Sequence, residues 1–143
     1  PESDRLLELW ENEDYNKYLN EGRIHLLEHP VSFHIYLKIA MIADLQGLDE
    51  LHYKNMFRYN GFARAVMATG SGETEKDALL VCYPWHEGTI MSEMGYEIKK
   101  QSLIKSKEEI FELVSGIDAS GNTEEFYFNI TIPYTELEKA LSQ

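Results

Sequence analysis

One pair of histidines in the chain has the spacing of a known kind of zinc site. His25 and His29 lie four residues apart with Glu28 between them, which is the H-x-x-E-H pattern of inverted zinc metallopeptidases. On a helix the two imidazoles share one face, and the carboxylate can act as a general base. A third, distant carboxylate ligand is also needed, and Pro30 ends the helix at once. We therefore interpret the histidines as ordinary residues of a last helical turn, where the helix dipole favours them, and keep a zinc hydrolase as the alternative.

A second group of residues has the components of a thiol hydrolase. Cys82 could supply a nucleophile and His86 its base, with Glu87 beside them. Cys82 belongs to the apolar run of residues 78–83, so its thiol is predicted to be buried in a strand and inert. Neither group amounts to a credible catalytic set, and we predict no catalytic residue, no metal ligand and no cofactor.

The segment around Trp85 indicates binding rather than catalysis. Tyr83 and Trp85 flank a proline and are followed by His86 and Glu87. Aromatic residues with polar tips are common anchors of interfaces, so these four residues are the candidate binding site. The competing interpretation is that Trp85 covers the core of a sheet.

A glycine-rich run, residues 69–74, resembles a phosphate-binding loop in composition only. It follows a helical segment rather than a strand, and it lacks the lysine of the P-loop pattern. We interpret the run as a hinge between a helical part, residues 1–69, and a β-rich part, residues 70–143, the two forming one compact unit.

The elements that must position these residues are helical in the first part of the chain. Apolar residues recur at helical spacing after Ser3 and in residues 12–29, 31–46 and 49–69. The segment 31–46 is apolar on nearly every side, which predicts a helix covered by its neighbours. In the segment that begins at Asp49, the side chains predicted to face inward are Tyr53, Met56, Phe57, Ala63, Val66 and Met67.

The spacing of these helices resembles that of tetratricopeptide repeats. Helix starts near Asp14 and Asp49 lie about 35 residues apart, close to that repeat's period. Gly22 falls where the first helix of such a repeat needs a small residue. The pattern predicts tetratricopeptide-like helical hairpins.

Beyond Gly72 the pattern changes to the two-residue period of strands. Strands are predicted at 78–83 and 96–104, with helical turns at 85–94 between them, and a hairpin is predicted from 110–118 and 123–132. The lysines of the second strand are typical of an exposed sheet edge. Pro133 should end the last strand and Thr135 should cap a final helix. The fold class is α+β, with the helical hairpins packed on a C-terminal, mainly antiparallel sheet of four or five strands.

Charge excludes several classes of partner. The 143 residues include 13 Lys and Arg against 25 Asp and Glu, a net charge of −12, which argues against nucleic acid and anionic membranes. No apolar run reaches the length of a membrane span or a signal-peptide core. The single cysteine excludes an internal disulfide. Because the chain begins at Pro1 without Met, we expect a processed or trimmed product whose targeting segment is gone.

The chain from Gly61 onward resembles a known family. The matching positions, in order, are Gly61-Phe62, Val66, Thr69-Gly70-Ser71-Gly72-Glu73-Thr74, Ala78, Val81, Glu87, Gly95-Tyr96, Gln101-Ser102-Leu103, Asp118, Gly121 and Phe126-Tyr127-Phe128-Asn129-Ile130. They are similar to the domain-of-unknown-function family numbered 4919, found mainly in gut Bacteroidetes. The helices before Gly61 match more loosely.

This resemblance implies a location but no site. Members resemble small envelope-directed proteins, many with signal peptides, so the chain is expected to be periplasmic or secreted, with a cytoplasmic location as the alternative. No catalytic or ligand-binding residue is implied. Members often show an acidic pair with an aromatic residue where this chain has His86-Glu87-Gly88.

Together these patterns predict a soluble, non-enzymatic binding or interaction module of the bacterial envelope. Its partner would be a protein or a small molecule. The alternatives are a hydrolase, either zinc-dependent through His25, Glu28 and His29 or thiol-based through Cys82 and His86, and a structural piece of a longer polypeptide.

Overall fold

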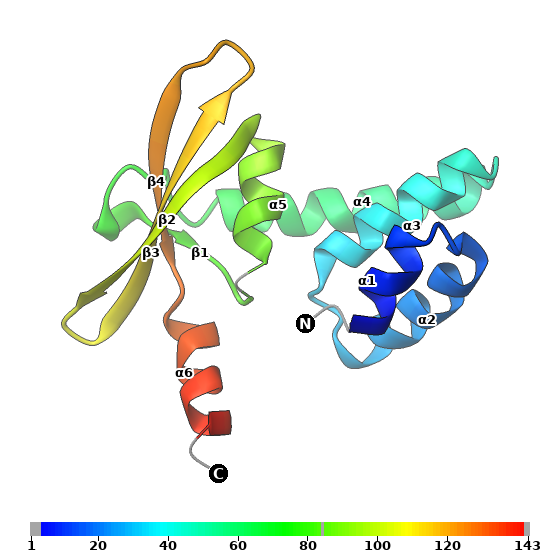
Figure 1. Cartoon of the computed structure of the whole chain (residues 1–143), viewed down its shortest axis with the longest axis horizontal. Coiled ribbons are helices and arrows are strands. Elements are labelled where there is room, and N and C mark those ends of the chain that lie inside the picture. The colour runs from blue at the N-terminus through cyan, green and yellow to red at the C-terminus, as the bar shows by residue number, and fades with distance from the viewer. Residues whose placement is uncertain (1–3, 84, 142–143) are drawn as a thin grey trace. The chain divides into compact units, whose positions relative to one another are not determined.

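The computed structural model describes residues 4–83 and 85–141 (Figure 1). The predicted cap Ser3 and the proline between Tyr83 and Trp85 lie outside these residues. Internal contacts divide the chain into two units, Pro1–Phe62 and Ala63–Gln143. We refer to them as the helical unit and the β-rich unit. Their boundary falls inside the fourth helix rather than in the glycine-rich run.

Four helices begin the chain, as the apolar spacing predicts. They are α1 (Asp4–Glu11), α2 (Tyr15–Glu28), α3 (Phe33–Leu45) and α4 (Asp49–Met67). The second helix begins later than predicted because Glu13, with φ of 56°, adopts the left-handed conformation that ends α1. The amide of Asp14 donates to the Leu9 carbonyl at 2.9 Å and that of Glu13 to the Trp10 carbonyl at 3.1 Å, the pattern of a Schellman cap.

The third helix is the covered element of the helical unit. Eight of its thirteen residues are buried: Phe33, His34, Ile35, Tyr36, Ile39, Ala40, Ile42 and Ala43. A methyl group on Gly22 of α2 would lie 3.4 Å from the Ile35 side chain and 3.5 Å from that of Ile39. A small residue at this position therefore allows the close approach of α2 and α3. The finer tetratricopeptide-like assignment stays a prediction.

The orientation predicted for α4 is wrong at two residues. Tyr53 is 71% exposed and Phe57 is 81% exposed. The buried side chains of this helix are Asn55, Tyr59 and Ala63, spaced four residues apart along one face. The prediction is confirmed for Ala63, and it missed Asn55 and Tyr59. Apolar residues occupy both faces of α4, so periodicity alone does not select the inner one.

The β-rich unit contains a four-stranded, mainly antiparallel sheet. Its strands are β1 (Leu79–Leu80), β2 (Tyr96–Ser106), β3 (Glu109–Asp118) and β4 (Thr123–Asn129), in the order β1-β4-β3-β2. The β2–β3 and β3–β4 pairs are antiparallel, and β1 pairs with β4 in parallel. The sheet twists strongly, and α5 (His86–Glu93) lies against β2 (Figure 1). The predicted α+β class is confirmed.

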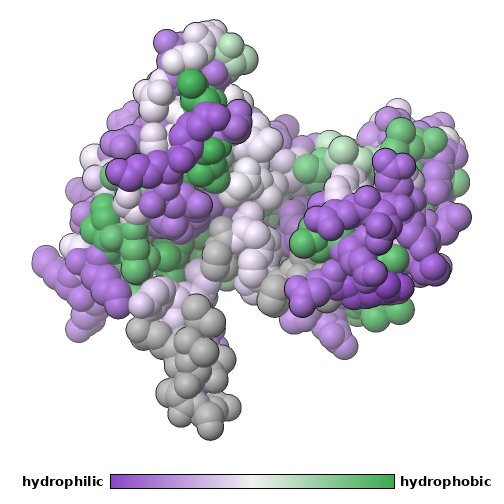
Figure 2. Space-filling model, viewed as in Figure 1, coloured by the Kyte–Doolittle hydropathy of each residue, from purple (hydrophilic) through white to green (hydrophobic). Residues whose placement is uncertain are grey.

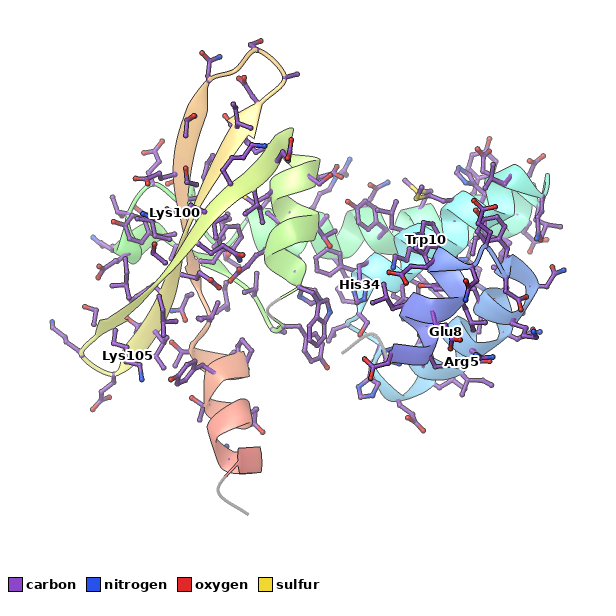
Figure 3. The ribbon with its side chains drawn as sticks, viewed as in Figure 1. Arg5, Glu8, Trp10, His34, Lys100 and Lys105 are labelled. Carbon is purple, nitrogen blue, oxygen red and sulfur yellow. The ribbon has the colours of Figure 1, made fainter. Side chains whose placement is uncertain are left out.

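The lysine-bearing strand β2 is an edge strand, as its composition predicts. Figure 3 marks Lys100 and Lys105 on it. The Lys105 amine donates to the Tyr134 hydroxyl at 3.0 Å and so joins β2 to α6 (Thr131–Leu141).

The predicted hairpin is present, and hydrogen bonds to one carboxylate stabilise its β3–β4 turn. The carboxylate of Asp118 accepts hydrogen bonds from the amides of Ser120 and Asn122 at 2.8 and 2.9 Å. The Asn122 side-chain amide also donates to Asp118, at 3.0 Å. This bond first, and the backbone amides after it, lower the pKa of Asp118. Gly121 supplies a φ of 86° that few other residues adopt.

The end of the sheet differs from the prediction. Strand β4 stops at Asn129, whose side-chain oxygen accepts a hydrogen bond from the Thr131 amide at 3.1 Å and caps α6. Ile132, which the sequence analysis placed in this strand, lies in the helix and is half exposed. Pro133 lies in the first turn of α6, where its missing N–H has no helical partner to lose. Thr135 is inside the helix rather than at its cap.

The glycine-rich run packs against the sheet. The Gly72 carbonyl accepts from the Tyr127 amide of β4 at 2.7 Å, and the Gly72 amide donates to the Asp77 carbonyl at 2.7 Å. A methyl group on Gly70 would lie 2.1 Å from that same carbonyl oxygen. These glycines are therefore required by close backbone packing beside β4.

Across the described ranges, no helix combines the length and the apolar character needed to cross a bilayer. Hydrophilic residues cover much of the visible face of the helical unit (Figure 2). An example is Arg5 of α1, whose guanidinium donates to Glu8 at 3.0 Å (Figure 3). Both side chains are about half exposed, so this ion pair lies on a solvated helix face.

Candidate functional site

The predicted binding residues lie where β1 leads into α5. The chain turns after Val81, and the His86 amide donates to the Tyr83 carbonyl at 3.1 Å as α5 begins. Because of this turn, the side chains of residues that are neighbours in sequence point in different directions at the N-terminus of α5.

Three of the four predicted residues form an aromatic cluster, which we define as Tyr83, Trp85 and His86. The rings of Tyr83 and Trp85 stack in parallel, with centroids 4.7 Å apart and planes 10° apart. The His86 ring meets both of them edge-on, at 5.2 and 6.3 Å. Tyr83 and Trp85 are half-buried, whereas His86 is 2% exposed. The result is a stacked pair of partly exposed rings supported from behind by a buried imidazole.

The fourth residue, Glu87, points elsewhere, since successive helical residues are rotated by about 100°. Its side chain is 1% exposed. Gln101 of β2 donates its amide N–H to the Glu87 carboxyl at 3.0 Å, and the Glu112 carboxyl of β3 lies near enough to raise the pKa of Glu87. Glu87 therefore faces the sheet, on the inner side of α5.

Burial and the neighbouring carboxyl of Glu112 together raise the pKa of Glu87 from 4.5 to about 9. Burial disfavours a negative charge on Glu87, and the nearby Glu112 carboxyl disfavours it further. The hydrogen bond from Gln101 lowers the pKa and opposes these effects only partly. Glu87 is thus protonated and neutral at pH 7, and it serves the interior of the β-rich unit.

Cys82 is exposed, which corrects the prediction of a buried thiol. Strand β1 contains only Leu79 and Leu80, and the two-residue alternation of the run buries Leu79 and Val81. Cys82, one residue further on, points outward. The exposed thiol and the buried His86 are therefore not presented together on the surface as a thiol hydrolase would require.

The predicted zinc pattern sits at the end of α2. The His25 and His29 rings lie 4.6 Å apart, and Glu28 is the last helical residue. Within residues 4–83 and 85–141, no group of three or more His, Cys, Asp or Glu side chains is placed to hold a metal ion. The third ligand that a zinc peptidase needs is therefore not supplied by the described residues.

Sequence reasoning missed a groove in the helical unit. It has a volume of about 500 Å³ and is lined by Arg23, Leu26, Leu27, Pro30, Tyr36, Leu51, Lys54, Asn55, Arg58 and Phe62. The available signal was the four-residue spacing of Lys54 and Arg58, which places two cations on one face of a helix. We call this feature the basic groove.

Comparison with protein families decides what the chain is related to. The sequence model of the domain of unknown function DUF4919 matches residues 3–139, so both units are included. The chain belongs to the DUF4919 family. The match confirms the resemblance seen from Gly61 onward and extends it over the helices.

No curated protein and no solved structure matches the chain. The DUF4919 description names no activity, so the function has to be argued from the residues of this chain.

Proposed function

We propose that this DUF4919 protein is a non-enzymatic binding module of the bacterial cell envelope, with a protein or a small molecule as its partner. The aromatic cluster carries the proposal. Its stacked Tyr83 and Trp85 rings, 4.7 Å apart, remain partly open to solvent at the start of α5.

The geometry of the cluster suits recognition. Tyrosine and tryptophan offer large, rigid contact areas with few rotatable bonds, and they are the residues most often found to dominate interface energies. The buried His86 ring and the hydrogen bond from its amide to Tyr83 hold the pair in place. Little conformational entropy is then lost when a partner covers the rings.

The described residues favour neither form of hydrolase. His25 and His29 have no third metal ligand within the described ranges. Cys82 is exposed while His86 is buried. A binding role therefore accounts for more of the geometry than catalysis does.

Affinity capture from an envelope extract tests the binding role. The matched control is Trp10→Phe, a change at the tryptophan of the helical unit. We expect a partner that wild type and Trp10→Phe retain and Trp85→Ala loses. With that partner purified, calorimetry should show roughly a tenfold or greater loss of affinity for Trp85→Ala. Equal binding by Trp85→Ala, or turnover of a substrate by the purified protein, contradicts the proposal.

The envelope location is supported by the family resemblance, whose members look envelope-directed, and with it we propose an origin among the Bacteroidetes. Immunoblots of periplasmic, membrane and cytoplasmic fractions of the source cells test the location. Recovery with the cytoplasmic markers alone would favour the cytoplasmic alternative.

A further inference from the structure

We propose that the basic groove of the helical unit binds an acidic peptide segment of a partner protein, with its carboxylates against Arg23, Lys54 and Arg58. Every lining residue belongs to the helical unit. The aromatic cluster belongs to the β-rich unit, so the two sites can be tested separately.

The charge of the groove points to an anion. Three cations line it, and none of the acidic residues in the described part of the chain does, although acidic residues outnumber basic ones by 25 to 13 in the whole sequence. All three cations are exposed, and none forms an ion pair with a residue of the described ranges. Their positive charge is therefore available to a ligand, and carboxylates that pair with arginine gain two parallel hydrogen bonds.

Arg58 is held in position for this role. Its guanidinium lies 5.5 Å from the centre of the Tyr36 ring, and Tyr36 stacks on Phe62 at 6.0 Å with planes 8° apart. Lys54 lies one helical turn before Arg58 on α4, so the two cations are neighbours on one face. A pre-positioned cation loses less conformational freedom on binding than a free side chain.

The groove also offers apolar contacts. Leu26, Leu51 and Phe62 line it between the cations, and Leu27, which is 83% exposed, forms part of the lining. Covering an exposed leucine of this kind removes apolar surface from water, which favours a ligand that has an apolar side chain of its own. A ligand with both carboxylates and a leucine-like side chain fits this lining better than a simple anion does.

The length of the depression favours an extended chain. A neighbouring hollow of about 460 Å³ shares Arg23 and Leu27 with the groove. Another, of about 420 Å³, shares Leu51 and Lys54. Three adjoining hollows suit successive side chains of a peptide rather than one compact molecule.

The outer hollow beside Lys54 contains Asp49 and Glu50. These carboxylates repel an acidic side chain there, so the acidic residues of the peptide are expected in the central groove. Charge thus sets the register of the peptide as well as its affinity.

Fluorescence anisotropy with a labelled peptide library tests the proposal on the full chain. The library varies the positions of Glu and Leu, and a second copy replaces each Glu by Gln. We expect Glu-Leu peptides to bind wild type, with roughly tenfold weaker binding to Arg58→Gln and to Lys54→Gln. The Gln copies should bind less, and added salt should weaken the Glu peptides.

Arg64→Gln is the matched control, because Arg64 is an exposed arginine of the same helix that lies outside the groove. It should bind the Glu peptides as wild type does, and so should Trp85→Ala. Circular dichroism checks that each variant is folded.

Three outcomes overturn the proposal. The first is that no library peptide binds wild type better than Arg58→Gln. The second is equal binding of the Glu and Gln copies. The third is that Arg58→Gln abolishes self-association measured by sedimentation, or binding to phosphatidylglycerol vesicles, which would make a second copy or a membrane the occupant.

Discussion

Each unit contains a buried ionisable side chain whose pKa is strongly shifted, and the two side chains are opposite in kind. In the helical unit, burial, with help from the charges of Lys38 and His25, lowers the pKa of His34 to about 3. In the β-rich unit, burial and Glu112 raise the pKa of Glu87 to about 9. Both groups are neutral at pH 7, since an uncompensated buried charge is far more costly than a neutral group.

The difference lies in which pH each unit tolerates. A folded-state pKa below the unfolded value of 6.5 means that His34 favours unfolding as pH falls from 6.5 towards 3. A folded-state pKa above the unfolded value of 4.5 means that Glu87 favours unfolding as pH rises from 4.5 towards 9. Acid should therefore weaken the helical unit, and base the β-rich unit. Trp10 and Trp85, one in each unit, can report the two transitions separately.

The largest difference in stability effect between the two units should come from a pair of glycine substitutions. Gly70→Ala would place a methyl group 2.1 Å from the Asp77 carbonyl oxygen and should lower the free energy of unfolding of the β-rich unit by about 3 kcal/mol or more. Gly22→Ala of α2 meets ordinary contacts of 3.4 Å and gains helix propensity, so its effect should stay within about 1 kcal/mol.

Urea titration followed by the fluorescence of single-tryptophan variants measures both effects. Trp10→Phe leaves Trp85 as the probe of the β-rich unit, and Trp85→Phe leaves Trp10 as the probe of the helical unit. A Gly22→Ala loss as large as that of Gly70→Ala would contradict the packing described for the two units.

Glu87→Gln should remove the alkaline weakness of the β-rich unit. Between pH 4.5 and 9 the wild-type group costs up to about 1.4 kcal/mol of stability for each pH unit. The isosteric amide carries no charge, so the variant should be more stable than wild type at pH 8 and similar at pH 5. Trp85 fluorescence in urea at the two pH values provides the measurement, and Glu93→Gln, an exposed change on the same helix, is the control. If the stability of wild type and of Glu87→Gln changed with pH in the same way, the buried Glu87 carboxyl would not be the cause of the alkaline loss of stability.

His34→Gln should act on the other unit and at the other end of the pH scale. Because the wild-type imidazole cannot take up a proton while folded, stability falls as pH drops below 6.5. The variant should lose less stability between pH 6.5 and 4, by up to about 3 kcal/mol. The probe is Trp10 fluorescence in urea, with His52→Gln, a half-buried histidine of α4, as the comparison. An unchanged acid transition in His34→Gln would show that another group sets it.

The smallest expected effects come from one cation–aromatic contact in each unit. Lys38 lies 4.9 Å from the Trp10 ring in the helical unit, and Lys105 lies 4.7 Å from the Tyr134 ring in the β-rich unit. Lys38→Met and Lys105→Met should each lower stability by about 0.5–1 kcal/mol. Equal losses would show that the two units use such contacts alike, and a loss only in Lys38→Met would indicate that desolvation decides their strength.

The features predicted correctly from sequence are those that depend on neighbouring residues. The covered helix at 31–46 follows from an apolar run, and the β3–β4 hairpin follows from alternation around a turn that Asp118 and Gly121 stabilise.

The missed features depend on residues that are distant in sequence. The inner face of α4 is chosen by its contacts with other helices, so the inward prediction for Tyr53 and Phe57 was wrong. Glu87 meets Glu112 only because α5 packs on the sheet in one register. The basic groove combines Arg23 of α2 with Arg58 of α4, a pairing that no local pattern reveals.

The parallel pairing of β1 with β4 has a consequence for the order of folding during synthesis. Leu79 of β1 pairs with Phe128 of β4. Strand β1 therefore cannot pair until nearly all of the β-rich unit has been synthesised. The residues of the helical unit are complete by Phe62, and their contacts are more local. The helical unit should therefore fold outside the ribosome while β4, the partner of β1, has not yet been synthesised. During this interval the nascent β-rich unit most needs protection from aggregation.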